Sequence, residues 1–304
     1  MVELLLSHGA DADGVKGSET GDFGEPLRWA AWSGHQDVVE LLLRNGAKLK
    51  PDESEAYPQW EPNRLLASAA HGGNLVVVRM LVERGESLPE PTLQTFENIL
   101  EGENPEVLAY LFEQGLVMPE QRYHRHIVSK LGRLVNDKGK SAAGNAVQFL
   151  EQCISHKLDF SHIYKSGSSM GHHAIQSYSD NNVLPSPDTD NGKNKDRYAM
   201  VLVKAVLNAG VDINHPDQDG ETMLMIAASR SKSQFVEYLL AQGADPSLKN
   251  NKGETALDRA IKDGRRLTRI WDKNLALKAA YADTIRMLGG DPAVLDMPVT
   301  KKNP

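Results

Sequence analysis

Four histidines stand in two close pairs, and histidine is both a common metal ligand and a common general base. His124 and His126 flank Arg125, and His172 is followed directly by His173. Two metal ligands on one helix need i, i+3 or i+4 spacing to share a face. Residues two apart lie about 200° apart around a helix, and adjacent residues about 100° apart. Neither pair therefore chelates a metal by itself, and the sequence predicts no metal site and no cofactor.

A thiolate–imidazole couple is the second candidate for chemistry. Cys153 and His156 are three residues apart, which would place them on one face of a helix. Cys153 also interrupts the apolar stripe of VQFLEQCI, which favours a buried structural thiol. The sequence has no phosphate-binding glycine loop or H-E-x-x-H motif, and Asp188 and Asp190 lack the closing Glu of an EF-hand. We therefore predict that the protein is not an enzyme.

The composition excludes several classes of protein. The longest apolar runs fall well short of the roughly 18 residues that a membrane helix needs, so no membrane partner is expected. The formal charge of −7 is spread along the chain, which argues against nucleic acid as a partner. Aromatic residues make up 6% and alternating β-branched tracts are missing, so a sheet-rich fold is not expected. One cysteine and an N-terminus without basic residues favour an intracellular location, cytoplasmic or nuclear.

The helices that would position any functional site are predicted from a repeated sequence pattern. An apolar stripe closed by glycine recurs as VELLLSHG (2–9), VVELLLRNG (38–46), VVRMLVERG (77–85), VLAYLFEQG (107–115), VKAVLNAG (203–210) and FVEYLLAQG (235–243). Each stripe predicts a short amphipathic helix that ends at a residue tolerant of the left-handed conformation. Most of the spacings between these glycines lie between 30 and 39 residues, which is typical of a helical repeat.

A second, shorter helix is predicted upstream of the first, at 26–31, 222–228 and 255–260. Turn-forming residues precede the last two copies, at 217–220 and 250–253, and Gly220 and Gly253 are 33 residues apart. Thr222 and Thr255 supply oxygens suited to an N-cap, and alanines allow paired helices to approach closely.

Together these helices resemble the ankyrin repeat family, whose signature runs turn, T-P-L-H-x-A-A, x-x-G-H, second helix and G-A-D. The residues that match are Pro26, Leu27, Ala30, Ala31, Gly34, His35, Leu41, Leu42, Gly46 and Ala47, then Gly220, Thr222, Leu224, Ala227, Ala228, Leu239, Leu240, Gly243, Ala244 and Asp245. The resemblance covers residues 1–88 and 203–292. It implies an all-α solenoid of about seven helix-pair repeats plus a partial N-terminal repeat.

The predicted organisation is a single solenoid over 1–292 followed by a flexible tail, 293–304. Residues 89–202 are expected to form enlarged, degenerate repeats, with helices near 120–136, 146–158, 170–179 and 197–210. Polar composition predicts a mobile insertion at 183–196 and smaller ones at 51–63 and 136–144. Residues 267–288 are expected to form one long capping helix. The first helix, 2–7, would expose an apolar side. A truncated domain, a mis-assigned start codon and a partner that covers the helix all remain open explanations.

The resemblance implies a concave groove of turn tips and inner helices that binds a protein partner. The candidate groove residues are Trp32, Ser33, His71, Gly72, Gln218, Asp219, Glu221, Ser229, Arg230, Asn251, Lys252, Glu254, Lys262 and Asp263. Trp32 and Arg230 are the leading anchors because Trp and Arg are the commonest hot-spot residues. Trp29 is expected in the core and His35 in a scaffold role. Arg265, Arg266 and Arg269 are read as the solvated face of a helix, with a docking patch as the alternative.

Two other functions stay open. The enlarged repeats could form a pocket for a small molecule or a reaction, lined by Tyr123, His124, His126, His172, His173 and Tyr178. The chain could also be a regulatory part of a larger polypeptide. The main prediction is a non-enzymatic interaction scaffold or adaptor.

Overall fold

The computed structural model describes residues 1–14, 26–49, 64–136, 140–178, 190–270 and 275–296. Within these ranges the regular structure is helical, and the only β-type pairing is an isolated bridge between Ile163 and Ser169. The prediction of an all-α repeat fold is thus confirmed. The chain divides into two compact units, residues 1–133 with 151–158 and residues 134–150 with 159–304, and each is described by itself. One continuous solenoid over 1–292 therefore stays a prediction.

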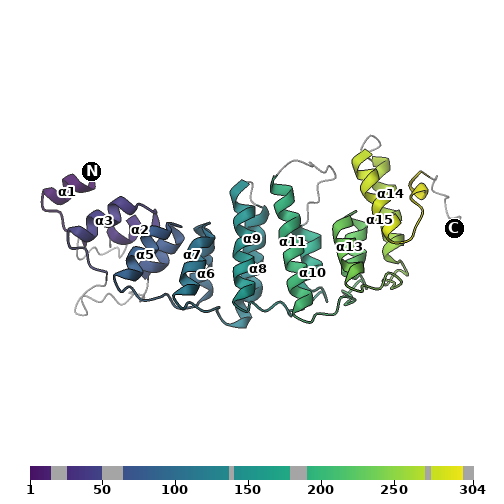
Figure 1. Cartoon of the computed structure of the whole chain (residues 1–304), viewed down its shortest axis with the longest axis horizontal. Helices are drawn as coiled ribbons and strands as arrows, with labels where there is room; N and C mark the ends of the chain where they lie inside the picture. Colours follow the sequence, from purple (N-terminus) through teal and green to yellow (C-terminus); the bar gives the residue numbers. More distant parts are fainter. Residues whose placement is uncertain (15–25, 50–63, 137–139, 179–189, 271–274, 297–304) are drawn as a thin grey trace. The chain divides into compact units, whose positions relative to one another are not determined.

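The first unit opens with a single helix, α1 (Val2–Ser7), and continues in helix pairs. The pairs are α2 (Pro26–Trp32) with α3 (Gln36–Arg44), α4 (Arg64–His71) with α5 (Leu75–Glu83), and α6 (Leu93–Glu101) with α7 (Pro105–Glu113). The inner helices α2, α4 and α6 pack on one another in sequence, and so do the outer helices α3, α5 and α7 (Figure 1).

The second unit has the same plan. It holds α10 (Met170–His173), which continues in the π-helical turn η3 (Ala174–Tyr178), then α11 (Asp190–Asn208), α12 (Met223–Ser229), α13 (Ser233–Ala241), α14 (Ala256–Ile270), α15 (Leu275–Met287) and the short η4 (Pro292–Leu295). A fourth pair, α8 (His124–Asn136) with α9 (Lys140–Ser155), contributes residues to both units. A short 3₁₀ turn, η2 (Gln121–Tyr123), leads into α8. In the described ranges, seven helix pairs thus follow α1, as predicted.

Glycines end the outer helices as the repeat pattern predicts. All six predicted terminal glycines have positive φ, from +85° at Gly210 to +107° at Gly115. In this conformation the backbone N–H of Gly46 reaches back to the carbonyl of Leu43, which satisfies a group the helix would otherwise leave free. The predicted Thr222 cap is also present, because its Oγ1 accepts a hydrogen bond from the N–H of Met225.

Successive repeats of the first unit are joined at the start of each outer helix. Asn74 caps α5 through its side-chain oxygen, and its Nδ2 donates a 3.0 Å hydrogen bond to the carbonyl of Gly34 in the preceding repeat. Asn104 repeats this arrangement one unit later, capping α7 and donating to the carbonyl of Gly73 at 2.8 Å. One side chain thus stabilises its own helix and fixes the spacing of two repeats.

Four sequence-based expectations differ from the structure. Trp29 is 52% exposed and is not a core residue. Helices begin inside two of the predicted insertions, since α9 starts at Lys140 and α11 at Asp190. Residues 51–63 and 183–189 lie outside the described ranges. The expected helix over 267–288 is divided between α14 and α15.

In the central insertions and at the C-terminal end, packing overrides local composition. The polar first turns of α11 extend a helix whose later residues Tyr198 and Leu202 are buried, and Lys and Arg are themselves good helix formers. The predicted tail is ordered at its start because Leu295 of η4 is buried. Trp29 is exposed because α2 is the first inner helix, and no earlier inner helix in the described residues packs on it.

Candidate functional site

A row of side chains crosses the inner helices of the first unit. Trp32, His71 and Glu101 are the last residues of α2, α4 and α6, and each stands three residues before the N-cap of the following outer helix. The Trp32 and His71 rings stack with centroids 3.5 Å apart at an interplanar angle of 15°. Nε2 of His71 lies 3.3 Å from Oε2 of Glu101. The four residues Trp32, His71, Glu101 and Lys130 are called the first-unit row below.

Lys130 of α8 completes this row. Its Nζ donates a 2.6 Å hydrogen bond to Oε1 of Glu101. That bond is the main cause of a lowered pKa of the Glu101 carboxyl, which partial burial opposes. Glu101 is thus held ionised between two cationic or polar partners. Sequence reasoning identified Trp32 and His71 but missed Glu101 and Lys130; comparing residues at equal distance from each N-cap would have found Glu101.

Ser33 and Gly72, the groove candidates that directly follow Trp32 and His71 in the sequence, have different roles. Ser33 is exposed beside Trp32, as a groove residue should be. Gly72, in contrast, is a packing residue, because a Cβ there would clash with the carbonyl oxygens of Ala31 and Trp32. The absence of a side chain at this position lets α4 lie close to α2. Gly72 was predicted to contact a partner in the groove, but its role in the structure is to allow this close packing.

Three turn tips of equal design lie in the second unit, at 164–168, 217–221 and 250–254. The first residue of each donates its N–H to the carbonyl of the fifth, at 2.9 to 3.0 Å. The tips are also bonded to one another, since the N–H of Gln218 donates to Ser166 and that of Asn251 donates to Asp219. The side chains of Gln218 and Asn251 reinforce this ladder by donating to the carbonyls of Lys165 and Gln218. The tip at 164–168 was missed because its sequence, YKSGS, carries no Asp or Asn.

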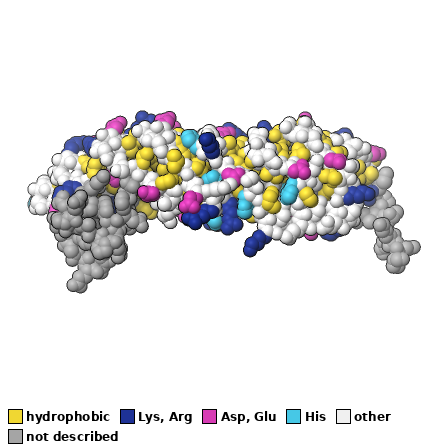
Figure 2. Space-filling view, turned by 90° about the horizontal axis from the view of Figure 1, so that it is seen from below, with side chains coloured by type: hydrophobic (Ala, Val, Ile, Leu, Met, Phe, Trp, Pro, Cys, Tyr) yellow, Lys and Arg dark blue, Asp and Glu magenta, His cyan; other side chains and the backbone are white. Residues whose placement is uncertain are grey.

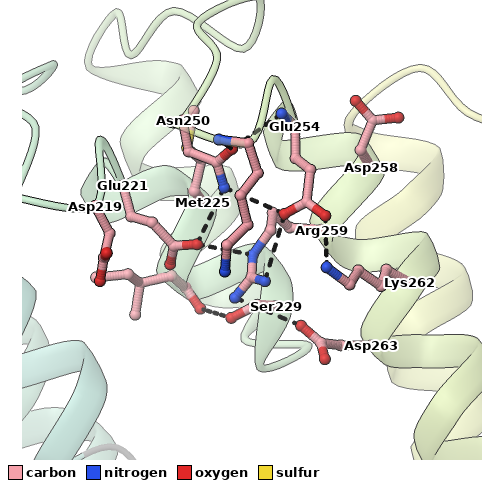
Figure 3. A network of polar contacts seen from close by, with 12 residues as sticks. Asp219, Glu221, Met225, Ser229, Asn250, Glu254, Asp258, Arg259, Lys262 and Asp263 are labelled. Carbon is pink, nitrogen blue, oxygen red and sulfur yellow. Dashed lines mark hydrogen bonds and ion pairs between the residues drawn. The ribbon is translucent and has the colours of Figure 1, made fainter.

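A polar network links the last two tips to the inner helix α14 (Figure 3). Arg259 lies at its centre, with Nε 3.0 Å from Glu221, NH1 3.7 Å from Glu254 and NH2 3.6 Å from Asp263. Asn250 donates 3.2 Å hydrogen bonds to Glu221 and Glu254. Lys262 hydrogen-bonds Glu254, which lowers the pKa of that carboxyl. The predicted groove residues Glu221, Glu254 and Lys262 are therefore brought together, through an arginine that the sequence did not single out.

The other inner-helix candidates of this unit are less accessible. Arg230 is half-buried, and burial lowers the pKa of its guanidinium. The carbonyl of Ser229 accepts a 2.7 Å hydrogen bond from the Tyr281 hydroxyl, and the Ser229 hydroxyl donates to the carbonyl of Ile226. Among the turn-tip candidates Gln218, Asp219, Asn251 and Lys252 are exposed, and so is Lys262 on α14.

The basic cluster at the start of the last repeat has local partners. Nε of Arg265 donates a 2.7 Å hydrogen bond to the carbonyl of Val294, and Arg266 pairs with Asp263 at 3.1 Å. The side chain of Arg269 lies outside the described residues. Arg265 thus ties α14 to the segment after α15.

The six residues of the alternative pocket divide between the units. Tyr123, His124 and His126 belong to the first, and His172, His173 and Tyr178 to the second. His124 is buried with Nε2 3.0 Å from the carbonyl of Pro119, whereas His126, two residues on, is exposed. Tyr123 lies under the guanidinium of Arg122. The side chain of Tyr178 lies outside the described residues.

His172 has a structural role in its own unit. The N–H of Ser169 donates to Nδ1, so Nδ1 is the acceptor and Nε2 carries the proton that faces the carbonyl of Glu221 at 3.2 Å. Burial lowers the pKa of the ring, which keeps it neutral. His172 therefore joins its helix cap to the next turn tip. Burial likewise lowers the pKa of His173, whose ring centroid lies 5.9 Å from that of Tyr164.

Cys153 and His156, the other candidates for chemistry, both lie in packed surroundings. Cys153 is completely buried, and burial raises the pKa of its thiol to about 12, so the thiolate is not available near neutral pH. His156 stacks on Phe112 with centroids 3.8 Å apart. Over the described residues, no cluster of three or more His, Cys, Asp or Glu side chains is arranged to hold a metal ion.

Two further findings concern the charged side chains on the surface and the length and apolar character of the helices. Lys and Arg side chains lie interspersed with Asp and Glu side chains on the face drawn in Figure 2. Among the helices of the described part of the chain, none combines the length and the apolar character needed to cross a membrane.

Comparison with known proteins identifies the repeats. A family model described as ankyrin repeats (many copies) matches residues 206–260, and the ankyrin repeat model matches residues 26–52. The putative ankyrin repeat protein L271 of Acanthamoeba polyphaga mimivirus is 40% identical over 65 residues, which are 21% of this chain and 9% of that protein. The ankyrin repeat and KH domain-containing protein mask-1 of Caenorhabditis elegans is 26% identical over 263 residues, 86% of this chain and 9% of that protein. The chain thus spans about a tenth of the length of either relative.

Solved structures resemble the chain more distantly. The ankyrin repeat domain of human ASB11 superposes with a TM-score of 0.47 at 20% identity, covering 77% of this chain and 91% of that one. The ankyrin repeat domain of Bcl-3 gives a TM-score of 0.44 at 21% identity, covering 79% and 94%. Both family models match helix pairs that end in the predicted glycines, and residues 26–52 and 206–260 are therefore ankyrin repeats.

Proposed function

We propose that the protein is a non-enzymatic interaction scaffold that binds a protein partner through the inner-helix face of its repeats. Ankyrin repeats are generally protein–protein interaction modules, which gives this class of function its support. The proposal places the scaffold inside the cell, in the cytoplasm or nucleus, with neither nucleic acid nor a membrane as its partner.

The first-unit row is the observation that carries the proposal. Trp32 is 36% exposed although it is large and apolar. Its ring is held in one orientation by the stack on His71, which is itself paired with Glu101. An exposed tryptophan whose rotamer is fixed before binding loses little conformational entropy in a complex. Such residues are the most frequent energetic anchors of protein interfaces.

The turn tips of the second unit support the same function. Their backbones are fixed by hydrogen bonds between tips, and the Arg259 network holds the last two tips to α14. Asp219 and Lys252 therefore project from a rigid base into solvent. Exposed charges at the edge of an interface select partners and speed association more than they add affinity.

The test is affinity capture with the full chain and two matched variants. Trp32→Ala removes the anchor, and Val76→Ala removes an exposed apolar side chain from the outer helix α5. Loss of an anchor costs roughly 2 kcal/mol, which is about a 30-fold weaker Kd. We expect a captured partner to be lost with Trp32→Ala and retained with Val76→Ala, with affinity measured afterwards on the purified pair.

Two results would contradict the proposal in different ways. Equal capture by both variants would mean that the partner binds elsewhere, and the inner-helix face would be wrong while the scaffold function survived. No capture by the parent chain, with the fold verified by circular dichroism, would count against the scaffold function itself.

A further inference from the structure

Helix α8 exposes a basic face over most of its length. The helix contains three cations, Arg125, Lys130 and Arg133, and no Asp or Glu. At about 100° per residue, these three and His126 lie within about 140° of the helix circumference. Arg125, His126 and Arg133 are exposed, and Lys130 is partly exposed. These four residues are called the α8 basic face below.

Most of this charge has no partner within the described part of the protein. Lys130 is the paired member, through its hydrogen bond to Glu101. Over the described residues, the side chains of Arg125, His126 and Arg133 form no hydrogen bond or ion pair. Two guanidinium groups and an imidazole are therefore available to another molecule.

The arrangement is electrostatically unfavourable for the helix that carries it. Lys130 and Arg133 are three residues apart, and like charges at this spacing destabilise a helix. Arg125 lies in the first turn, which has no acidic residue although the helix dipole favours one there. Helix α3, in contrast, pairs Arg44 with Glu40 one turn away. Locally unfavourable residues of this kind are typical of functional sites.

The surroundings of the α8 basic face favour a short anionic ligand. Acidic side chains border it, since Glu101 of α6 contacts Lys130 and exposed Glu120 precedes the helix. From Arg125 to Arg133 the face extends about 12 Å along the helix, the length of about four residues of an extended peptide. A long polyanion such as nucleic acid would continue past this span onto a chain whose formal charge is −7. A short acidic peptide segment would not.

We propose that the α8 basic face docks a short acidic segment of the protein partner, with its Asp and Glu side chains paired to Arg125 and Arg133. The proposal rests on the proposed function in one respect, because it takes the partner to be a protein. Lys130 belongs both to the α8 basic face and to the first-unit row. The acidic segment thus binds on the same inner-helix face as the anchor Trp32. Exposed ion pairs of this kind select a partner and speed its association more than they add affinity.

The probe is a fluorescein-labelled acidic peptide, GDEDEDG, with GNQNQNG as its uncharged counterpart. Fluorescence anisotropy of each peptide is followed while the full chain is added, at about 20 mM salt, where screening is weak. We expect the acidic peptide to bind and the uncharged peptide not to bind. At about 500 mM salt the binding should be lost, because the Debye length then falls to a few ångström.

Matched variants locate the binding site. Arg125→Gln/Arg133→Gln removes two charges from the α8 basic face, and Arg44→Gln/Arg84→Gln removes two exposed charges from the ends of α3 and α5. Both double variants therefore have the same net charge. We expect the first to weaken the Kd of the acidic peptide by about fivefold, within the range that two exposed ion pairs contribute. The second should change the Kd by less than about twofold. Glutamine is a good helix former, and circular dichroism verifies both folds.

Three results would overturn the proposal. Equal weakening by the two double variants would mean that the peptide responds to net charge alone. Failure of the parent chain to bind GDEDEDG would show that the face does not recognise acidic segments. Tighter binding of an oligothymidine of equal charge, lost with Arg125→Gln/Arg133→Gln, would identify nucleic acid as the occupant.

The scaffold function is tested separately, because none of these measurements uses Trp32. A partner captured in a Trp32-dependent way would keep the scaffold function even if the acidic peptide does not bind. Peptide binding that requires Arg125 and Arg133, with no captured partner, would instead support the α8 basic face and count against the scaffold function alone.

Discussion

The residue before the N-cap adopts a left-handed backbone in four outer helices, α3, α5, α7 and α13, and only two of these repeats use glycine there. Gly34 and Gly73 have φ of +68° and +65°, whereas Glu103 and Ser231 have φ of +50° and +52° at the same position. Glycine adopts this region freely, but a side chain there costs roughly 1–2 kcal/mol. The repeats with Glu103 and Ser231 therefore carry backbone strain that the glycine repeats lack.

This difference predicts opposite effects for reciprocal substitutions. Ser231→Gly should raise the free energy of unfolding by about 0.5 kcal/mol, since relief of strain exceeds the roughly 0.4–1 kcal/mol entropy gained by the unfolded chain. Gly73→Ala should lower it by about 2 kcal/mol or more, because a left-handed alanine is strained and its Cβ would also clash with the carbonyl of Gly102. Urea unfolding followed by circular dichroism measures both.

Ser33→Gly is the control for the first of these effects. Ser33 is exposed and is not among the residues with positive φ. The same chemical change there gains nothing from strain relief and should be neutral or slightly destabilising. If Ser33→Gly and Ser231→Gly change stability equally, strain at Ser231 is not the cause.

At this scale the sequence predicts backbone roles better than surface contacts. The terminal glycines and the Thr222 cap follow from local conformation, and the structure has them. The pairing of Glu101 with His71 and Lys130 joins three helices that are far apart in sequence, so no local pattern contains it. Trp29 was assigned to the core from its register, which assumes a preceding inner helix that the described residues do not include.

The element with the least sequence signal is η4, which lies in the segment expected to be a tail. Leu295 is buried, and a Cβ on Gly264 of α14 would press on its side chain and on the Tyr281 ring. Asp291 caps η4 by accepting the N–H of Ala293. The glycine inside α14 is thus explained by the close approach of two other elements.

Leu295→Ala should therefore lower the free energy of unfolding by about 2–3 kcal/mol, the usual cost of a leucine-sized cavity. The matched control is Leu275→Ala in α15, where the same side chain is 77% exposed and its loss should change stability by at most about 0.5 kcal/mol. Thermal and urea unfolding of the two variants provide the comparison. Equal, small effects would show that η4 adds nothing to the cap, and the tail would then begin where the sequence placed it.

Helix existence and order were predictable because the apolar stripe and the terminal glycine are both local signals. Helix limits in the central repeats were not, since α9 and α11 begin in polar segments that composition marks as loops. The lengths of these helices depend on residues buried further along them, such as Phe149 in α9 and Tyr198 in α11. Buried apolar residues within a helix also stabilise the turns on either side of them. The polar composition of the end residues is therefore a weak guide to where the helix begins.

At the scale of the whole molecule, stability in a repeat protein is a sum of nearest-neighbour contacts. Each repeat touches only its neighbours, so damage to one interface weakens the adjacent repeats first. The inner helices follow this rule within each unit, where α4 packs on α2 and α6, and α12 packs on η3 and α14. The two compact units are therefore expected to respond differently to a local substitution.

Hydrogen exchange of the Gly73→Ala variant tests this expectation. Gly73 joins its own repeat to the following one, since its carbonyl accepts from Asn104 and its Cα lies against Gly102. Amides in α4–α7 should therefore exchange faster than in the parent, by roughly 30-fold for about 2 kcal/mol of local destabilisation. Amides in α12–α15 should keep their parental rates. Leu295→Ala should give the converse pattern, with faster exchange in α12–α15 and unchanged exchange in α2–α5. If either variant accelerates exchange uniformly along the chain, the molecule unfolds as one cooperative body, and the nearest-neighbour description would be wrong for this protein.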